Sequence, residues 1–268
     1  MPDLILWGAS ALLLAGVMSL AWGIQLATGQ GAWVDALWPF GVGAAGLLVA
    51  LWPLSAGEIQ FRQGAVAGLV ALWSLRLGGH LVERALKGAA DERYEALKRQ
   101  WGDKAQGRLF VFLMLQAAAG ALLVVSLLVA ARNPAPGPSP MDLLGVLVML
   151  VALGGEATAD RQLASFKANP ANRGRICDTG LWAWSRHPNY FFEWLGWCAW
   201  PLLAIDLTGQ WPWGWLALTA PVYIYWLLTR VSGVPPLEAH MRRTRPEAFA
   251  DYAARTSRFF PRPPKSPN

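Results

Sequence analysis

The sequence predicts an all-α integral membrane bundle of about seven transmembrane helices. Of its 268 residues, 54% are hydrophobic and only 15% are charged, and the mean hydropathy is +0.31. The apolar residues come in long blocks that charged segments separate, which is typical of membrane proteins. A hydrocarbon core of roughly 30 Å needs about 20 helical residues to cross it. Seven blocks meet this need, at residues 4–27, 32–54, 63–81, 109–131, 142–164, 190–206 and 211–229.

Local signals support the blocks in turn. We expect the first block to be a helix and not a signal peptide, because no basic residue precedes it. Tryptophans lie near several block ends, where an amphipathic ring prefers the headgroup layer; they are Trp7, Trp22, Trp33, Trp38, Trp52, Trp211 and Trp213. The charged segment 91–101 predicts a surface helix in which Glu95 and Arg99 pair. Four prolines within 133–140 predict a loop between the fourth and fifth blocks.

The basic residues predict the orientation. All but three of the 23, namely Arg62, Arg76 and Arg132, lie in the last turn of the fifth block or follow the third, fifth or seventh block. In a seven-helix bundle these segments share one face, and the positive-inside bias makes that face cytoplasmic. We therefore expect one domain, 1–268, with its N-terminus outside, its C-terminus in the cytoplasm, and cytoplasmic segments at 80–108, 160–189 and 230–268.

Composition also excludes some functions. The net charge of +6 follows from membrane topology, and no base-reading motif accompanies it, so we predict no nucleic-acid partner. Cys177 and Cys198 lack the spacing of metal ligands, so we predict neither a metal site nor a disulfide.

The start of the sixth block predicts an anion site. Pro188 suits the first turn of a helix, whose free N–H groups, with Arg186 and His187 beside them, favour an anion such as phosphate. Glu193 follows about one turn later and should face inward toward a partner, because lipid exposure of a carboxylate is costly. The alternative is a basic helix end that reaches for lipid headgroups.

Other ionisable residues support a shared polar cavity on the cytoplasmic side. Glu156 and Asp160 lie four residues apart, as do Arg76 and His80, so each pair shares a helix face. Arg230 ends the seventh block. Ionisable groups at membrane depth are functional candidates, although structural ion pairs remain an alternative.

Asp35 is a candidate acid toward the other face of the bundle. It lies between Trp33 and Trp38, and a carboxyl group walled by indole rings favours its protonated form and can donate a proton. The alternative is a carboxylate that interacts with the dipole at the start of the second helix.

Several motifs together carry a resemblance. They are Asp160-Arg-Gln-Leu, Phe166-Lys, Asn169-Pro, Asn172-Arg-Gly, Asp178-Thr-Gly-Leu-Trp, Ser185-Arg-His-Pro-Asn-Tyr-Phe, Glu193, Arg230-Val-Ser-Gly-Val-Pro, Arg245-Pro, Tyr252, Arg255-Thr-Ser and Phe259. With these motifs the chain resembles the DUF1295 family of bacterial membrane proteins of unknown function, which are related to steroid 5α-reductases. The resemblance covers most of the chain and is densest over 160–193 and 230–261.

The resemblance implies a seven-helix reductase of the bacterial inner (cytoplasmic) membrane. It would bind NADPH from the cytoplasm and reduce the conjugated double bond of a 3-oxo-4-ene steroid or a similar lipophilic enone. We expect a monomer whose other partners are membrane lipids. By position, the implied cofactor contacts are Arg76, His80, Arg84, Lys87, Glu156, Asp160, Lys167, His187, Asn189, Tyr190, Glu193 and Arg230. A preference for the 2′-phosphate of NADPH over NADH would come from extra cations, and Arg84, Lys87, Arg173 and Arg175 are available.

The chain departs from those reductases where they bind the ketone. They use a Gln-Glu pair near the start of the second helix and a Tyr on the third; the counterparts in this sequence are Val34-Asp35 and Trp73. The predicted chemistry is hydride transfer from NADPH to the β-carbon of the enone, with a protonated Asp35 polarising the carbonyl.

The sequence leaves two other functions open. Isoprenylcysteine carboxyl methyltransferases, which use S-adenosylmethionine, share a similar Arg-His-Pro-x-Tyr segment, but they tend to carry paired glutamates where Leu237-Glu238-Ala239 offers one. A transporter is disfavoured because the polar residues cluster on one face and not near the midplane between repeats.

Overall fold

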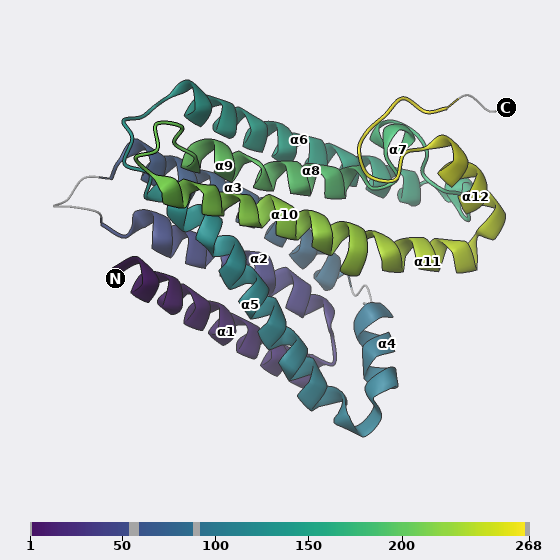
Figure 1. Cartoon of the computed structure of the whole chain (residues 1–268). Helices are drawn as coiled ribbons and strands as arrows, with labels where there is room; N and C mark the ends of the chain where they lie inside the picture. The colour runs from purple at the N-terminus through teal and green to yellow at the C-terminus, as the bar shows by residue number, and fades with distance from the viewer. Residues whose placement is uncertain (1, 54–58, 88–91, 266–268) are drawn as a thin grey trace. The chain divides into compact units, whose positions relative to one another are not determined.

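The structure is a computed structural model that describes residues 2–53, 59–87 and 92–265. These residues form helices, turns and loops, and no strand occurs among them. Figure 1 shows these helices in chain order. Their contacts divide them into two compact units. Unit 1 comprises Met1–Leu143 and Trp200–Thr219, and unit 2 comprises Leu144–Ala199 and Ala220–Asn268.

Four long helices form the body of unit 1. They are α1 (Pro2–Thr28), α2 (Ala32–Leu51), α3 (Phe61–Leu86) and α5 (Ala105–Ala131), and α2 packs against the other three. Small residues let these helices approach closely. A Cβ atom added at Gly43 would lie 2.3 Å from Ser74 Oγ, and one at Gly46 would lie 2.8 Å from a Leu127 methyl group. A larger residue at either position would therefore force the neighbouring side chain to move.

Shorter elements complete unit 1. The polar helix α4 (Glu92–Trp101) and the 3₁₀ turn η1 (Gly102–Lys104) lead into α5, and the 3₁₀ helix η3 (Pro212–Leu218) packs on it. α4 confirms the predicted surface helix, although Glu95 pairs with Lys98 at 2.9 Å and not with Arg99. The predicted loop at 133–140 is confirmed up to Pro140, where α6 (Pro140–Ala168) begins.

A closed ion pair joins two of these elements. Arg62 of α3 binds Asp142 of α6 through two hydrogen bonds of 2.7 and 2.9 Å, and the two residues are 5% and 0% exposed. The remaining guanidinium nitrogen of Arg62 donates to the carbonyl groups of Asn133 and Ala135. Each charge of this pair is thus balanced and hydrogen-bonded.

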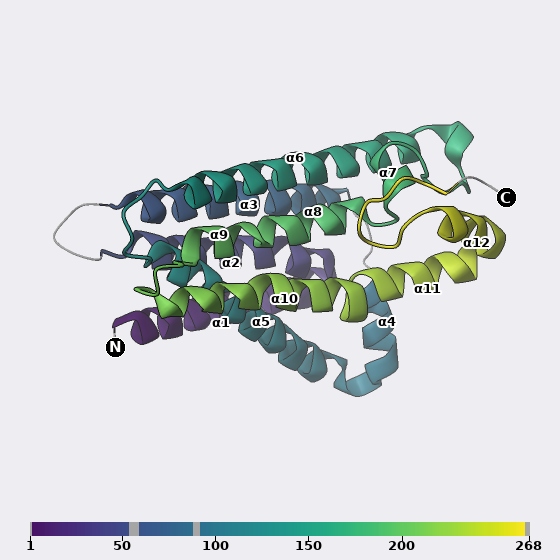
Figure 2. The same cartoon turned by 45° about the horizontal axis from the view of Figure 1, so that its top comes forward.

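Unit 2 contains most of α6 and a series of shorter helices. These are η2 (Pro170–Asn172), α7 (Leu181–Trp184), α8 (Pro188–Trp197), the first residue of α9 (Ala199–Ala204), most of α10 (Thr219–Trp226), the π-helix η4 (Leu227–Val231), α11 (Val234–Thr244) and α12 (Pro246–Arg255). α6 and α8 approach closely, because Gly155 lies against the Phe192 ring and Gly196 against Met149. In Figure 2 the chain that follows α12 passes beside α7.

Five of the seven predicted blocks are confirmed as helices long and apolar enough to cross a membrane. They are α1, α2, α3, the helix that ends with α5, and α6. The sixth and seventh blocks are helical but divided, the sixth into α8 and α9, and the seventh into η3, α10 and η4. Prolines explain this division, because Pro201 and Pro221 each lack an N–H donor inside the block. Ser126 Oγ donates instead to the Ala217 carbonyl, which lies four residues before Pro221. A count of seven spans and the orientation remain predictions.

Candidate functional site

A buried carboxylate lies at the centre of unit 2. Glu238 of α11 is 2% exposed, and its Oε1 accepts a hydrogen bond of 2.9 Å from Arg186 Nε and lies 3.3 Å from His187 Nε2. Its Oε2 lies 3.3 Å from a terminal nitrogen of Arg242 and 3.8 Å from Arg258 Nε. Burial alone would raise the pKa of Glu238, but hydrogen bonds from His187 and Arg186 outweigh it and lower the pKa to about 2. The carboxylate is therefore ionised throughout the physiological range.

His187 contributes a neutral ring to this cluster. Burial lowers its pKa below the ordinary value of 6.5, although the carboxylate of Glu238 opposes that shift. Because Nε2 faces a carboxylate, the tautomer with its hydrogen on Nε2 is favoured. The ring also stacks on Tyr190, with centroids 5.7 Å apart and planes 9° from parallel. The Glu238 cluster (Arg186, His187, Glu238, Arg242 and Arg258) thus holds one negative charge and three guanidinium groups.

Hydrogen bonds tie the C-terminal segment to the connection between α7 and α8. Ser185 Oγ donates to the carbonyl oxygen of Phe259 at 2.8 Å, and the Arg262 N–H donates to that of Trp184 at 2.9 Å. The Arg186 guanidinium donates to the carbonyl oxygens of residues 253 and 256. These bonds fix the path of residues 256–262, which we call the C-terminal strap.

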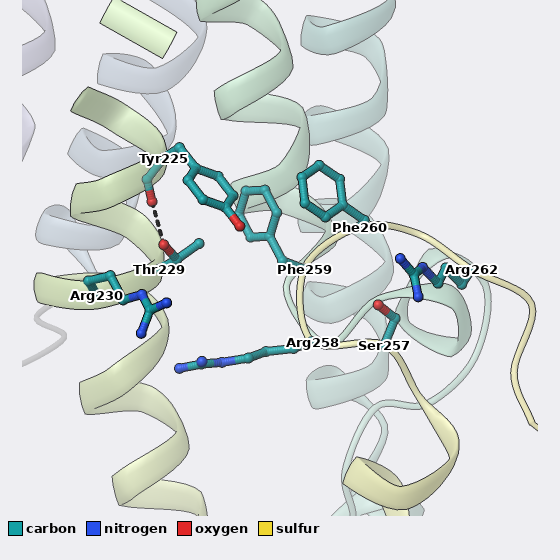
Figure 3. Close-up of a pocket in the computed structure, with 8 residues that line it drawn as sticks. All are labelled: Tyr225, Thr229, Arg230, Ser257, Arg258, Phe259, Phe260 and Arg262. Atoms are coloured by element: carbon teal, nitrogen blue, oxygen red, sulfur yellow. Dashed lines mark hydrogen bonds between the residues drawn. The ribbon is translucent and has the colours of Figure 1, made fainter. Parts of the chain in front are cut away.

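An open pocket of about 260 Å³ lies between the strap and the last turns of α10 and η4 (Figure 3). Arg230, Arg258 and Arg262 contribute three guanidinium groups to its lining, and Thr229 and Ser257 contribute hydroxyl groups. The rest of the lining is aromatic and consists of Tyr225, Phe259 and Phe260. None of these described lining residues is acidic. An open, cationic pocket with hydroxyl donors and apolar ring faces suits an anionic ligand with a ring system.

The structure brings together two predicted cofactor residues at the α6–α8 interface. Asn189 Nδ2 donates to Asp160 Oδ1 at 3.3 Å. One turn farther along α8, Glu193 Oε1 accepts a hydrogen bond of 2.8 Å from Trp197 Nε1. Glu156 lies one turn before Asp160 on α6 and is 5% exposed. The predicted inward orientation of Glu193 is consistent with its bond to a buried tryptophan.

The other predicted residues of unit 2 are spread out. Arg230 lines the pocket. Lys167, Arg173 and Arg175 are exposed on the end of α6 and the connection to α7, and none of the three is among the described residues around the pocket. Their contact with a cofactor stays a prediction.

In unit 1, Asp35 lies at the end of the bundle where α3 finishes. Its Oδ1 accepts a hydrogen bond of 2.9 Å from the Tyr94 hydroxyl, and its Oδ2 lies 3.6 Å from Arg84. Gln116 Nε2 donates a hydrogen bond of 3.4 Å to the same hydroxyl. The expectation that Asp35 lies toward the face opposite the basic segments is therefore wrong. The reason is that α2 and α3 form a hairpin, so the start of one shares an end with the finish of the other.

The remaining predicted residues of unit 1 lie along α3. Trp73 is 3% exposed and packs edge-on against Trp38, with centroids 6.3 Å apart. Arg76 is half-buried, and His80, one turn later, is exposed. Lys87 forms an ion pair of 2.5 Å with Glu83, and both side chains are at least 65% exposed.

Sequence reasoning did not assign Glu238, Arg258 or Arg262 to the site. Glu238 was considered only as a single glutamate where methyltransferases carry two. Its partner Arg186 lies 52 residues earlier, and no spacing rule connects them. Arg258 stands beside the motif residues Arg255 and Phe259, which is the one signal that could have drawn attention to it.

Comparison with known proteins identifies the family. The chain belongs to the DUF1295 family of proteins of unknown function, whose model matches residues 21–256, and this confirms the family predicted from the motifs. The relation to steroid 5α-reductases stays a prediction. No curated protein and no solved structure matches the chain.

Proposed function

We propose that this DUF1295 protein is an NADPH-dependent reductase of the bacterial inner membrane, and that it acts on the conjugated double bond of a lipophilic enone such as a 3-oxo-4-ene steroid. The observation that carries the proposal is the pocket between η4 and the strap, with its three arginines and two hydroxyl groups. Guanidinium groups bind phosphate oxygens through paired hydrogen bonds, so such a pocket suits a ligand with several phosphoryl groups.

Charge balance supports a strongly anionic ligand. Glu238 offsets one positive charge of its cluster, and no acidic residue is present among the described residues that line the pocket. NADPH carries three phosphoryl groups, which would compensate the arginines. The rings of Tyr225, Phe259 and Phe260 offer apolar faces against which a base can pack.

The chemistry of the proposal balances as a two-electron reduction. The bound coenzyme supplies a hydride to the β-carbon of the enone and leaves oxidised, and the α-carbon takes a proton. The protein has to bind both molecules, exclude water and place a hydrogen-bond donor at the carbonyl oxygen. The sequence-based candidate for that donor is Asp35, which would have to be protonated to donate; its two carboxyl oxygens face the Tyr94 hydroxyl and Arg84.

A methyltransferase is the competing function, and the pocket argues against it. S-adenosylmethionine carries no phosphoryl group, and its sulfonium is a cation, so it would leave the three arginines uncompensated. Those methyltransferases tend to carry paired glutamates, whereas this chain has Glu238 alone. Its carboxylate is already bound by Arg186 and faces His187.

Ligand-dependent unfolding tests the proposal. A ligand that binds only the folded state stabilises it by about 2.7 kcal/mol at 100 times its Kd. We expect NADPH to raise the Tm of the purified protein in detergent, and Arg230→Met to reduce the shift strongly. Arg243→Met is the matched control, because Arg243 is an exposed arginine of α11 outside the pocket lining. A Tm raised by S-adenosylmethionine and not by NADPH would support the methyltransferase instead. NADPH oxidation with a 4-ene-3-one steroid then tests the reaction.

A further inference from the structure

Two cations of the pocket converge from separate segments. Arg230 belongs to η4 and Arg258 to the C-terminal strap, and both line the pocket. Figure 3 shows the side chain of Arg258 extended from the strap toward Arg230. Two positive charges repel at short range, and an arrangement that directs them at one volume is favourable when an anion lies between them.

The position of Arg258 has an identifiable cause. Its Nε lies 3.8 Å from Glu238 Oε2, on the side of the carboxylate that does not contact Arg186 Nε. The far end of the side chain is directed toward Arg230 (Figure 3). Glu238 is itself held by Arg186 and His187, so it cannot follow Arg258 if that side chain moves.

We infer that Arg230 and Arg258 clamp one phosphoryl group between them, and that Glu238 is a positioning residue that holds Arg258 for this contact. This inference rests on the proposed function in one respect, namely that the phosphoryl group belongs to the coenzyme. It makes the strap a functional wall of the site. A phospholipid headgroup offers the same chemistry and is a separate arm of the test.

Arg242 provides a matched control within the same cluster. Its terminal nitrogen lies 3.3 Å from the same oxygen of Glu238, but its side chain is 67% exposed and it is not among the described lining residues. If Glu238 only stabilised the fold through its arginine partners, Arg242→Met and Arg258→Met would have similar effects on binding.

The first experiment measures Kd for NADPH and for inorganic pyrophosphate on the full chain in detergent. We expect Arg258→Met and Arg230→Met each to raise both values about 10- to 100-fold, since hydrogen bonds to charged groups are lost. The double variant should be less impaired than the product of the single effects, because the two residues share one anion. Arg242→Met should stay within about twofold. Unchanged pyrophosphate and NADPH affinities in Arg258→Met, or independent effects in the double variant, would overturn the clamp.

The second experiment isolates the positioning role of Glu238. The steepness of log Kd against log salt reports how many cations contact the ligand. We expect Glu238→Gln to flatten this dependence as Arg258→Met does, and Glu238→Asp to restore part of it. Arg242→Met should keep the wild-type slope. A wild-type slope in a folded Glu238→Gln protein would remove the positioning role. Arg258 is about half exposed, so its variant keeps the clamp testable if Glu238→Gln does not fold.

A third experiment, with a phospholipid as ligand, distinguishes a failure of this inference from a failure of the proposed function. Short-chain phosphatidylglycerol is titrated into the same variants. If only the lipid shows affinity that depends on Arg230 and Arg258, the clamp holds a headgroup and the proposed cofactor function fails. If pyrophosphate and NADPH show that dependence, both stand. If no phosphoryl compound shows it, the clamp is wrong whatever the protein reduces.

Discussion

Units 1 and 2 each contain a buried carboxylate that is paired with arginine, and the two sites differ in their charge balance. In unit 1, Arg62 and Asp142 form a bidentate pair in which one cation meets one anion, and the other terminal nitrogen of Arg62 donates to two backbone carbonyl groups. In unit 2, the single carboxylate of Glu238 lies within 4 Å of three arginines and one histidine. The first arrangement is electrically closed, whereas the second has an excess of positive charge beside a pocket.

This contrast separates a structural ion pair from a ligand site. A balanced buried pair has no capacity for another ion, because its lone pairs and protons are already used. An unbalanced cluster keeps an unfavourable charge excess that a ligand of opposite sign can relieve. Burial and short distances are common to both pairs, so the net charge and the adjoining pocket carry the functional argument.

Breaking the closed pair should have the largest effect. Asp142→Asn leaves the Arg62 guanidinium buried without its counterion, which typically costs about 3–5 kcal/mol. We expect a strongly reduced Tm in detergent and an NADPH affinity within about twofold of wild type in the protein that remains folded. A normal Tm would show that this pair is not the structural contact that we describe.

The ion pair of Asp35 with Arg84 is only partly buried. The Asp35 side chain is 18% exposed and the Arg84 side chain 45%. We expect Asp35→Asn to lower turnover about 100-fold or more, the usual cost of removing a group that stabilises transition-state charge. NADPH affinity should be nearly unchanged. The check is steady-state turnover alongside a direct Kd measurement, with Asp103→Asn as an exposed acid control. Wild-type turnover in Asp35→Asn would exclude this residue from the mechanism.

The Glu238 cluster should also give the stability of unit 2 a pH dependence. The pKa of His187 is lowered in the folded protein, so below about 6.5 the unfolded chain binds a proton that the folded chain does not. Stability is therefore present above that value and is lost as the pH falls through it. Glu238, with a pKa of about 2, adds a loss only below its ordinary value of 4.5. We expect His187→Gln to flatten the fall of Tm between about pH 7 and pH 5. An identical profile in this variant would assign that fall to another group.

The exposed pair of Lys87 and Glu83 should matter least. Such pairs contribute about 0–1 kcal/mol, so Lys87→Gln should barely change the Tm. The same variant decides whether Lys87 belongs to the cofactor site, as the resemblance implies. A Kd for NADPH raised severalfold would place it there, and an unchanged Kd would leave it as a solvated surface residue.

The sequence predicted what depends on local pattern and failed where distant residues meet. Long apolar blocks predicted α1, α2, α3, α5 and α6, because hydrophobicity and helix length are properties of one segment. The sixth and seventh blocks looked equally continuous, but Pro201 and Pro221 divide them, and apolar composition alone does not report a missing donor.

The candidate functional site was also predicted only in part, because some of its residues are distant in the sequence. His187, Asn189 and Arg230 were found from their motifs, and Asn189 does meet Asp160. Glu238 was missed, since nothing in its neighbourhood indicates that Arg186 will contact it across 52 residues. Tyr94 was missed because a charged segment predicts a solvated helix, whereas this side chain is 3% exposed and bonds to Asp35.

The affinity for NADPH as a function of salt tests the central claim most directly. If the arginines of the pocket bind phosphoryl groups, wild-type protein should bind NADPH at low salt and lose affinity steadily as KCl is added. Adenosine, which has no phosphoryl group, should bind far more weakly. An affinity that is indifferent to salt, or equal for NADPH and adenosine, would contradict the account.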